Sequence, residues 1–87
     1  MCTYVTSTTD VSGSGRAGAD DAWFRVTRAV VYFDHPQDAP LDHALCIDVW
    51  GGGVTERVAV ELDAASARRL AETILATLDH DEVKLLV

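Results

Sequence analysis

Residues 41–50 of this chain, LDHALCIDVW, alternate strictly between two sets of side chains. Successive side chains of a β-strand point to opposite faces of its sheet, so a period of two predicts a strand inside a sheet. The register with a neighbouring strand must then match apolar side chains on each face, because a slip of one residue would reverse every side chain. This segment therefore limits the chain to folds with an ordered sheet.

The other segments supply the partners of this strand. Strand-favouring residues fill 3–11, 23–34 and 55–62, while 12–21, 35–40 and the glycines at 51–53 predict turns. Asp63 is a predicted N-cap, and residues 64–78 repeat apolar side chains with helical spacing. Residues 83–87 are apolar and predict a short fifth strand. The expected fold class is α+β in one domain spanning 1–87: a four-stranded antiparallel meander, ββββα, with the helix on one face.

Pairing strand 23–34 with strand 41–50 so that Val31 lies opposite Ile47 matches apolar residues throughout one face. We call this the histidine face, and its further pairs are Phe33 with Leu45 and His35 with His43. The opposite face, the tyrosine face, pairs Tyr32 with Cys46, Val30 with Asp48 and Arg28 with Trp50. The single helix is expected to cover the histidine face.

The tyrosine face is more apolar than a solvated face needs to be, which is typical of an interface. The sequence therefore predicts a homodimer formed through that uncovered face. The alternative is a monomer with scattered exposed apolar residues. The predicted interface residues are Tyr4, Val30, Tyr32, Ala44, Cys46 and Trp50.

The histidine pair is the main candidate for chemistry. In this register the Cβ atoms of His35 and His43 lie ~5 Å apart, so the two imidazoles could share a zinc, copper or nickel ion. Asp34 and Asp42 adjoin them and could complete or orient the site. The alternative is that both rings cap the open end of the core and hydrogen-bond the turn.

Cys2 is a second candidate metal ligand or nucleophile. Removal of Met1 would expose an amine and a thiolate on the same residue, a pair suited to soft metals. The alternative is an ordinary thiol at the end of a strand. Because no export signal is recognisable, Cys2 and Cys46 are expected to be free thiols in a reducing, cytoplasmic compartment.

Charge and motif content exclude several classes of protein. The net charge of −7 argues against binding to nucleic acid, which requires clustered Lys and Arg. No apolar run approaches the ~20 residues that span a bilayer, so no membrane association is expected. Residues 13–18 read GSGRAG, which matches G-x-G-x-x-G, but a strand pattern rather than a helix follows. We therefore interpret this segment as a loop without a phosphate.

Several segments resemble a small uncharacterised family of actinobacterial proteins, a domain of unknown function sometimes encoded near natural-product genes. The resemblance rests on MCTY at 1–4, WFRVT at 23–27, VYFDHP at 31–36 and APLDHAL at 39–45. It implies a cytoplasmic bacterial protein and draws attention again to His35 and His43. Cys46 departs from the Asn expected there, which argues against Cys46 as a ligand.

Two hypotheses follow. In the first, the protein is a small metalloprotein, an enzyme or accessory factor of secondary metabolism, with His35 and His43 as ligands and Asp34 or a second subunit completing the site. In the second, it is a non-catalytic homodimer that binds an apolar small molecule or a protein partner. Whether the protein is an enzyme stays open at this point.

Overall fold

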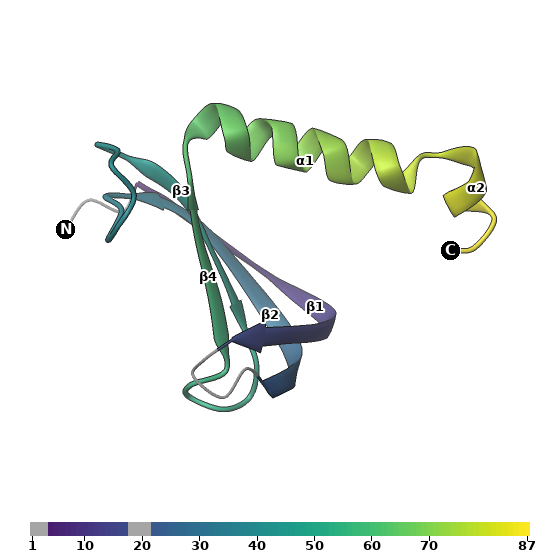
Figure 1. Ribbon diagram of the computed structural model, residues 1–87, viewed down its shortest axis with the longest axis horizontal. Helices are drawn as coiled ribbons and strands as arrows, with labels where there is room; N and C mark the ends of the chain where they lie inside the picture. Colours follow the sequence, from purple (N-terminus) through teal and green to yellow (C-terminus); the bar gives the residue numbers. More distant parts are fainter. Residues whose placement is uncertain (1–3, 18–21) are drawn as a thin grey trace.

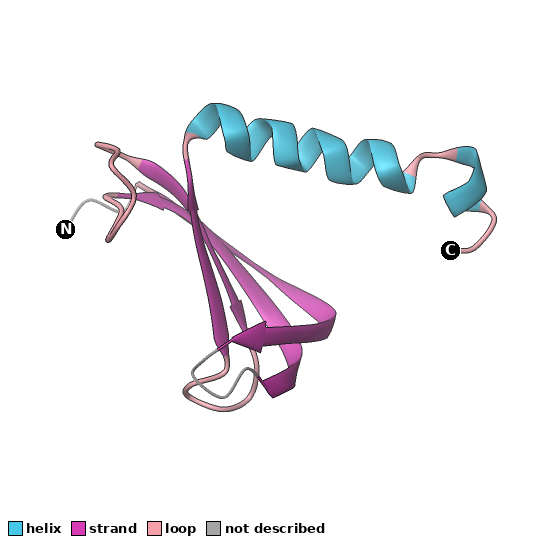
Figure 2. Ribbon diagram, viewed as in Figure 1, coloured by secondary structure: helices cyan, strands magenta, loops and turns pink. Residues whose placement is uncertain are grey.

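The computed structural model describes residues 4–17 and 22–87, and these residues form a four-stranded antiparallel sheet followed by two helices (Figures 1 and 2). The sheet order β1-β2-β3-β4 is that of a meander, as predicted. The chain is therefore an α+β fold. The elements are β1 (Val5–Ala17), β2 (Ala22–Asp34), β3 (Ala44–Trp50), β4 (Arg57–Leu62), α1 (Ala64–Leu78) and α2 (Asp81–Lys84).

The predicted alignment of the two central strands is confirmed. Val31 of β2 pairs with Ile47 of β3, and Tyr32 pairs with Cys46. The same alternation extends into β4, where Val60 lies opposite Ile47 and Glu61 lies opposite Cys46. Matching of apolar side chains on one face was thus sufficient to select the register.

β1 is longer than the sequence predicts. It continues to Ala17 through glycines and serines that we interpreted as part of a turn. Strand β2 pairs with β1 as far as Ala17, which lies opposite Ala22. Hydrogen bonding between the two strands therefore overrides the weak strand preference of the glycines and serines. A shift in register between Asp10 and Gly13 accommodates the extra residues. Gly13 and Gly15 thus lie in a strand without a helix after them, and Gly18 lies outside the described residues.

Helix α1 has the predicted bounds and the predicted cap. The carboxylate of Asp63 accepts a hydrogen bond from the backbone N–H of Ser66 at 2.6 Å, which satisfies one of the free donors of the first turn. The fifth strand at 83–87 is wrong, because Asp81–Lys84 form the short helix α2. His80 caps this helix by accepting from the N–H of Glu82, and the acidic first turn suits the positive end of a helix.

The core lies on the face opposite to the predicted one. The described side chains that are buried all belong to the tyrosine face or its continuation along β2: Val26, Ala44, Cys46 and Asp48. Helix α1 lies on the predicted side, since it lines a cleft together with the histidine face, but it leaves that face half-buried and contributes no buried residue itself. The helix begins directly after Asp63, and Figure 1 shows it diverging from the sheet along its length.

The single chain is unusually open for its size. Its radius of gyration is 14.6 Å, whereas a compact chain of this length has a radius of about 12 Å. Within the part of the chain that the structure describes, no helix has both the length and the apolar content to cross a bilayer. The openness comes from α1 and α2, which extend away from the strands.

Candidate functional site

An apolar cleft lies between α1 and the histidine face of the sheet. The cleft has a volume of about 620 Å³. Its sheet wall consists of Val31, Phe33, Leu45 and Ile47, and its helix wall includes Leu70, Ile74 and Leu75. Arg68 and Glu72 are the charged residues at its rim. The lining is therefore that of an apolar binding site or an interface.

The helix wall of this cleft is open to solvent. Ile74 is 51% exposed and Leu75 is 61% exposed, and Leu78 continues the same apolar stripe beyond the cleft at 48%. A helix of a folded domain normally buries such a stripe against its own sheet. Among residues 4–17 and 22–87, nothing covers the stripe of α1 to the extent that its apolar area would require.

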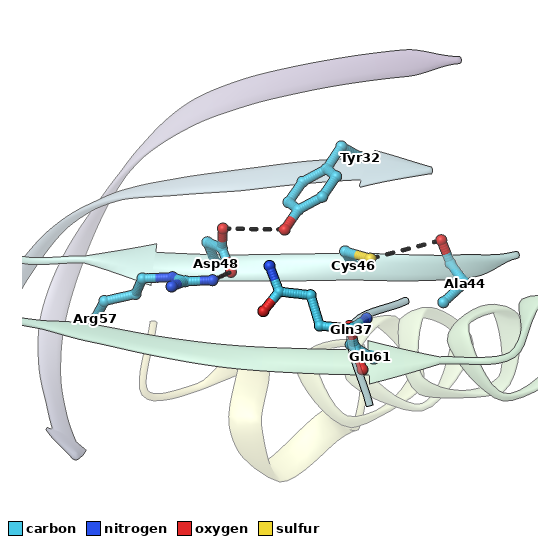
Figure 3. Close-up of polar contacts among 7 residues, drawn as sticks. All are labelled: Tyr32, Gln37, Ala44, Cys46, Asp48, Arg57 and Glu61. Carbon is cyan, nitrogen blue, oxygen red and sulfur yellow. Dashed lines mark hydrogen bonds and ion pairs between the residues drawn. The ribbon is translucent and has the colours of Figure 1, made fainter. Parts of the chain in front are cut away.

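The tyrosine face carries a polar cluster instead (Figure 3). The carboxylate of Asp48 on β3 is almost buried, accepting hydrogen bonds from the hydroxyl of Tyr32 at 3.2 Å and from the guanidinium of Arg57 at 3.1 Å. Burial, followed by the charge of Asp48, raises the pKa of Tyr32. The phenol therefore stays protonated and keeps donating to the carboxylate. Asp48 is compensated by these two partners, as a buried charge must be.

Glu61 attaches the loop after β2 to this face. Its carboxylate accepts hydrogen bonds from the backbone N–H groups of Gln37, Asp38 and Ala39 at 2.5, 3.1 and 3.0 Å. These bonds, that of Gln37 first, lower the pKa of Glu61. Because Glu61 lies opposite Cys46, the loop is drawn over that end of the tyrosine face. A shallow polar pocket of about 400 Å³ remains between the loop and Arg57.

Two of the predicted interface residues, Ala44 and Cys46, are buried within the single chain. Ala44 is 0% exposed and Cys46 is 3% exposed within one chain, so neither can contact a partner, and their assignment to an open interface is corrected. Cys46 is a free thiol whose pKa is raised, first by burial and then by the neighbouring carboxylates. Such a thiol is unreactive in the folded chain.

The remaining predicted interface residues lie at different places. Val30 and Tyr32 are half-buried on the tyrosine face, while the indole of Trp50 lies beside the guanidinium groups of Arg28 and Arg57 at 5.6 and 5.3 Å. Tyr4 is corrected to the other side, since its hydroxyl is 3.2 Å from Nε2 of His43. The six residues therefore do not form one continuous apolar surface.

The sheet register brings the two histidines together as predicted. The rings of His35 and His43 are stacked with their centroids 4.7 Å apart, and the ring of Phe33 also stacks with that of His43, at 5.8 Å. Nδ1 of His35 donates to the backbone carbonyl of Asp42 at 2.8 Å. Each ring thus has a protein partner on one nitrogen, which leaves Nε2 of His35 and Nδ1 of His43 for any further ligand.

The other predicted metal ligands do not complete this pair. The Asp34 carboxylate accepts from the backbone N–H of His35 at 2.6 Å, and Cys2 lies outside the described residues. Among residues 4–17 and 22–87, no three His, Cys, Asp or Glu side chains gather closely enough to hold a metal ion.

Sequence reasoning missed the parts played by Arg57 and Glu61. Both alternate with the apolar residues of β4, so their direction onto the tyrosine face was available from the pattern. The position of residues 37–39 could not be predicted, because a loop between two prolines has no repeating pattern of side chains.

Comparison with known proteins gives one match. The profile of a family of unknown function matches residues 1–87, the full length of the chain. No curated protein and no solved structure matches.

Proposed function

Because the chain belongs to DUF6295, a family of unknown function, we propose its role from its own surfaces: a non-catalytic, homodimeric binding module. The partner that covers the apolar cleft is a second copy of the chain. This proposal keeps the predicted homodimer but moves its interface from the tyrosine face to the cleft between α1 and the histidine face.

The main support for a homodimer is that one chain exposes more surface than a folded monomer of its mass. Its accessible surface is 6639 Å², about 1,600 Å² more than a folded monomer of 9.4 kDa is expected to expose. Obligate homodimers bury about 1,000–2,500 Å² on each protomer. The surplus on one chain therefore matches what a stable homodimer would remove from solvent.

The location of this surplus supports the cleft as the interface. Large exposed apolar side chains occur on several elements, but α1 and the residues after it carry a continuous series of them, namely Leu70, Ile74, Leu75, Leu78, Leu85, Leu86 and Val87. On the sheet wall of the cleft the apolar side chains are half-buried. Arg68 and Glu72 place one positive and one negative charge at the rim. Two copies related by a two-fold axis would bury the same patch on each chain.

The test is the mass of the protein in solution, measured by light scattering after size exclusion. The wild-type chain is expected to be a dimer at micromolar concentration. Ile74→Glu is expected to yield monomers, because a carboxylate would be buried at the contact. The matched control is Ala76→Glu, which adds the same charge on the opposite side of α1 and should leave the dimer intact. A wild-type chain that stays monomeric would overturn the proposal.

A second candidate is metal binding at His35 and His43, favoured by the close approach of their rings. The ligands would be Nε2 of His35 and Nδ1 of His43, and the ion would be zinc, copper or nickel. Calorimetric titration of untagged protein with each ion tests this. A site at the two histidines predicts saturable binding of one ion per chain, and His43→Ala should abolish it. Unchanged binding in that variant would exclude the site.

A further inference from the structure

The residues that follow α1 form an ordered apolar projection. We define residues 79–87 as the C-terminal arm. Leu85, Leu86 and Val87 are 87%, 85% and 87% exposed, and Figure 1 places α2 well beyond the sheet. Three consecutive apolar side chains with so little cover are typical of an interaction site.

Hydrogen bonds hold the arm in a compact turn. The backbone N–H groups of Val83 and Lys84 both donate to the carbonyl of His80 at 3.0 Å, and the N–H of Leu86 donates to Val83 at 2.9 Å. The apolar tip is thus presented by a folded segment. A folded segment loses less conformational entropy on docking than a loose chain would.

The arm cannot reach the cleft of its own chain. α1 is a continuous helix of 15 residues, which is about 22 Å long, and it carries the arm away from the sheet from which it starts. The cleft lies beside the first three turns of this helix. In a dimer with two-fold symmetry, however, an equivalent cleft belongs to the other copy.

We propose that the two copies exchange their C-terminal arms, so that the apolar tip of each arm occupies the cleft of the other copy. This inference rests on the homodimer proposed above and names the segment that forms it. The charges are complementary, since the acidic first turn of α2, Asp81 and Glu82, can approach Arg68 at the rim of the cleft. Exchange of this kind closes with two copies and leaves neither arm exposed.

The first test removes the apolar tip. The double variant Leu85→Asp/Leu86→Asp is expected to weaken dimerisation at least about 100-fold, because two buried leucines would be replaced by two carboxylates. The dissociation constant is measured by analytical ultracentrifugation, with Ala76→Glu as control. If the double variant is as dimeric as the wild type while Ile74→Glu is monomeric, arm exchange is wrong and the homodimer stands. If the wild type is monomeric, both proposals fail.

The second test does not depend on the stability of that variant. Two chains of different mass, one with Leu86→Cys and one with Val31→Cys, are mixed in a Cys2→Ser background and oxidised. Arm exchange predicts a disulfide between the two different chains, whereas Thr77→Cys in place of Leu86→Cys should not form it. If Leu86→Cys and Val31→Cys placed together in one chain form only an intrachain disulfide, the arm folds back and the proposal is overturned.

Discussion

The hydroxyl of Tyr32 on β2 donates to the carboxylate of Asp48 on β3 across 3.2 Å, next to the pair that Asp48 forms with Arg57. The acceptor is a charged and nearly buried carboxylate, so removal of the hydroxyl donor would leave part of that charge without a partner. The bond also joins the two central strands beneath the attached loop. It is therefore a sensitive place to test the core as it is arranged here.

Tyr32→Phe is expected to lower the free energy of unfolding by about 1.5–3 kcal/mol, the range for a hydrogen bond to a charged group. Urea unfolding followed by circular dichroism measures this change. Tyr4→Phe is the matched control, because the hydroxyl of Tyr4 bonds His43 at the exposed edge, and should change stability by less than about 0.5 kcal/mol. Equal losses in the two variants would contradict the assignment of the core to the tyrosine face.

The attachment of the loop through Glu61 predicts a dependence of stability on pH. The pKa of Glu61 in the folded chain is below its ordinary value of 4.5, so the folded chain prefers the ionised carboxylate. The stabilisation is fully present above the pKa of the unfolded chain and is lost as the pH falls through the folded pKa. Unfolding measured from neutral to acidic pH should show this decline.

Glu61→Gln separates this effect from that of other acids. An amide has one accepting oxygen where the carboxylate uses both, so its NH2 group would face an N–H donor of the loop and the variant should be less stable at neutral pH. Because the amide does not take up a proton on acidification, stability should decline less steeply as the pH falls. The carboxylate of Asp63, whose pKa is lowered by its cap contact with Ser66, retains its own contribution in both proteins. An acid profile identical in slope to the wild type would argue against the loop attachment.

Gly51 and Gly52 offer a matched pair in the turn after β3. A Cβ atom on Gly51 would lie 2.8 Å from the backbone oxygen of Arg25 and 2.8 Å from Phe24, whereas one on Gly52 meets nothing within 4 Å. Gly51→Ala should therefore destabilise the protein by about 1–3 kcal/mol, since the backbone contact cannot move cheaply. Gly52→Ala should be close to neutral. Thermal unfolding of both variants checks the close approach of β2 to this turn.

The strand order and the central register were predictable from the sequence because they depend on alternation. On the histidine face of β3, Leu45, Ile47 and Val49 each have an apolar partner across β2, and a slip of one residue would lose all three pairs. The bounds of α1 were predictable for a similar reason, since Asp63 and the helical repeat after it are local signals.

The face that becomes the core was not predictable in this way. Both faces of β3 are apolar enough to be buried, and the choice between them depends on Glu61 and on the backbone of residues 37–39. Those contacts join segments distant in sequence through main-chain N–H donors, which every residue except proline possesses whatever its side chain. The direction of α1 depends likewise on the backbone at Asp63, and that geometry has no signature in composition. The histidine pair was predictable because it continues the register of the strands.

The burial of Cys46 gives a probe of the same loop. Its thiol lies 3.7 Å from the carbonyl of Ala44 under residues 37–39, and its pKa is raised by burial and by Glu61. Alkylation by iodoacetamide should therefore require opening of the loop or of the sheet, and should be at least about 100-fold slower than in urea-unfolded protein if opening costs about 3 kcal/mol. Mass spectrometry of the peptide that contains Cys46 distinguishes it from Cys2.

Glu61→Gln should increase the rate of this alkylation in the folded protein, because it weakens the bonds that keep the loop closed over Cys46. Gly52→Ala, which leaves the loop untouched, is the control and should react as slowly as the wild type. Rapid alkylation of the wild type at neutral pH would mean that the tyrosine face is open after all, and the interface would then have to be sought there rather than at the cleft beside α1.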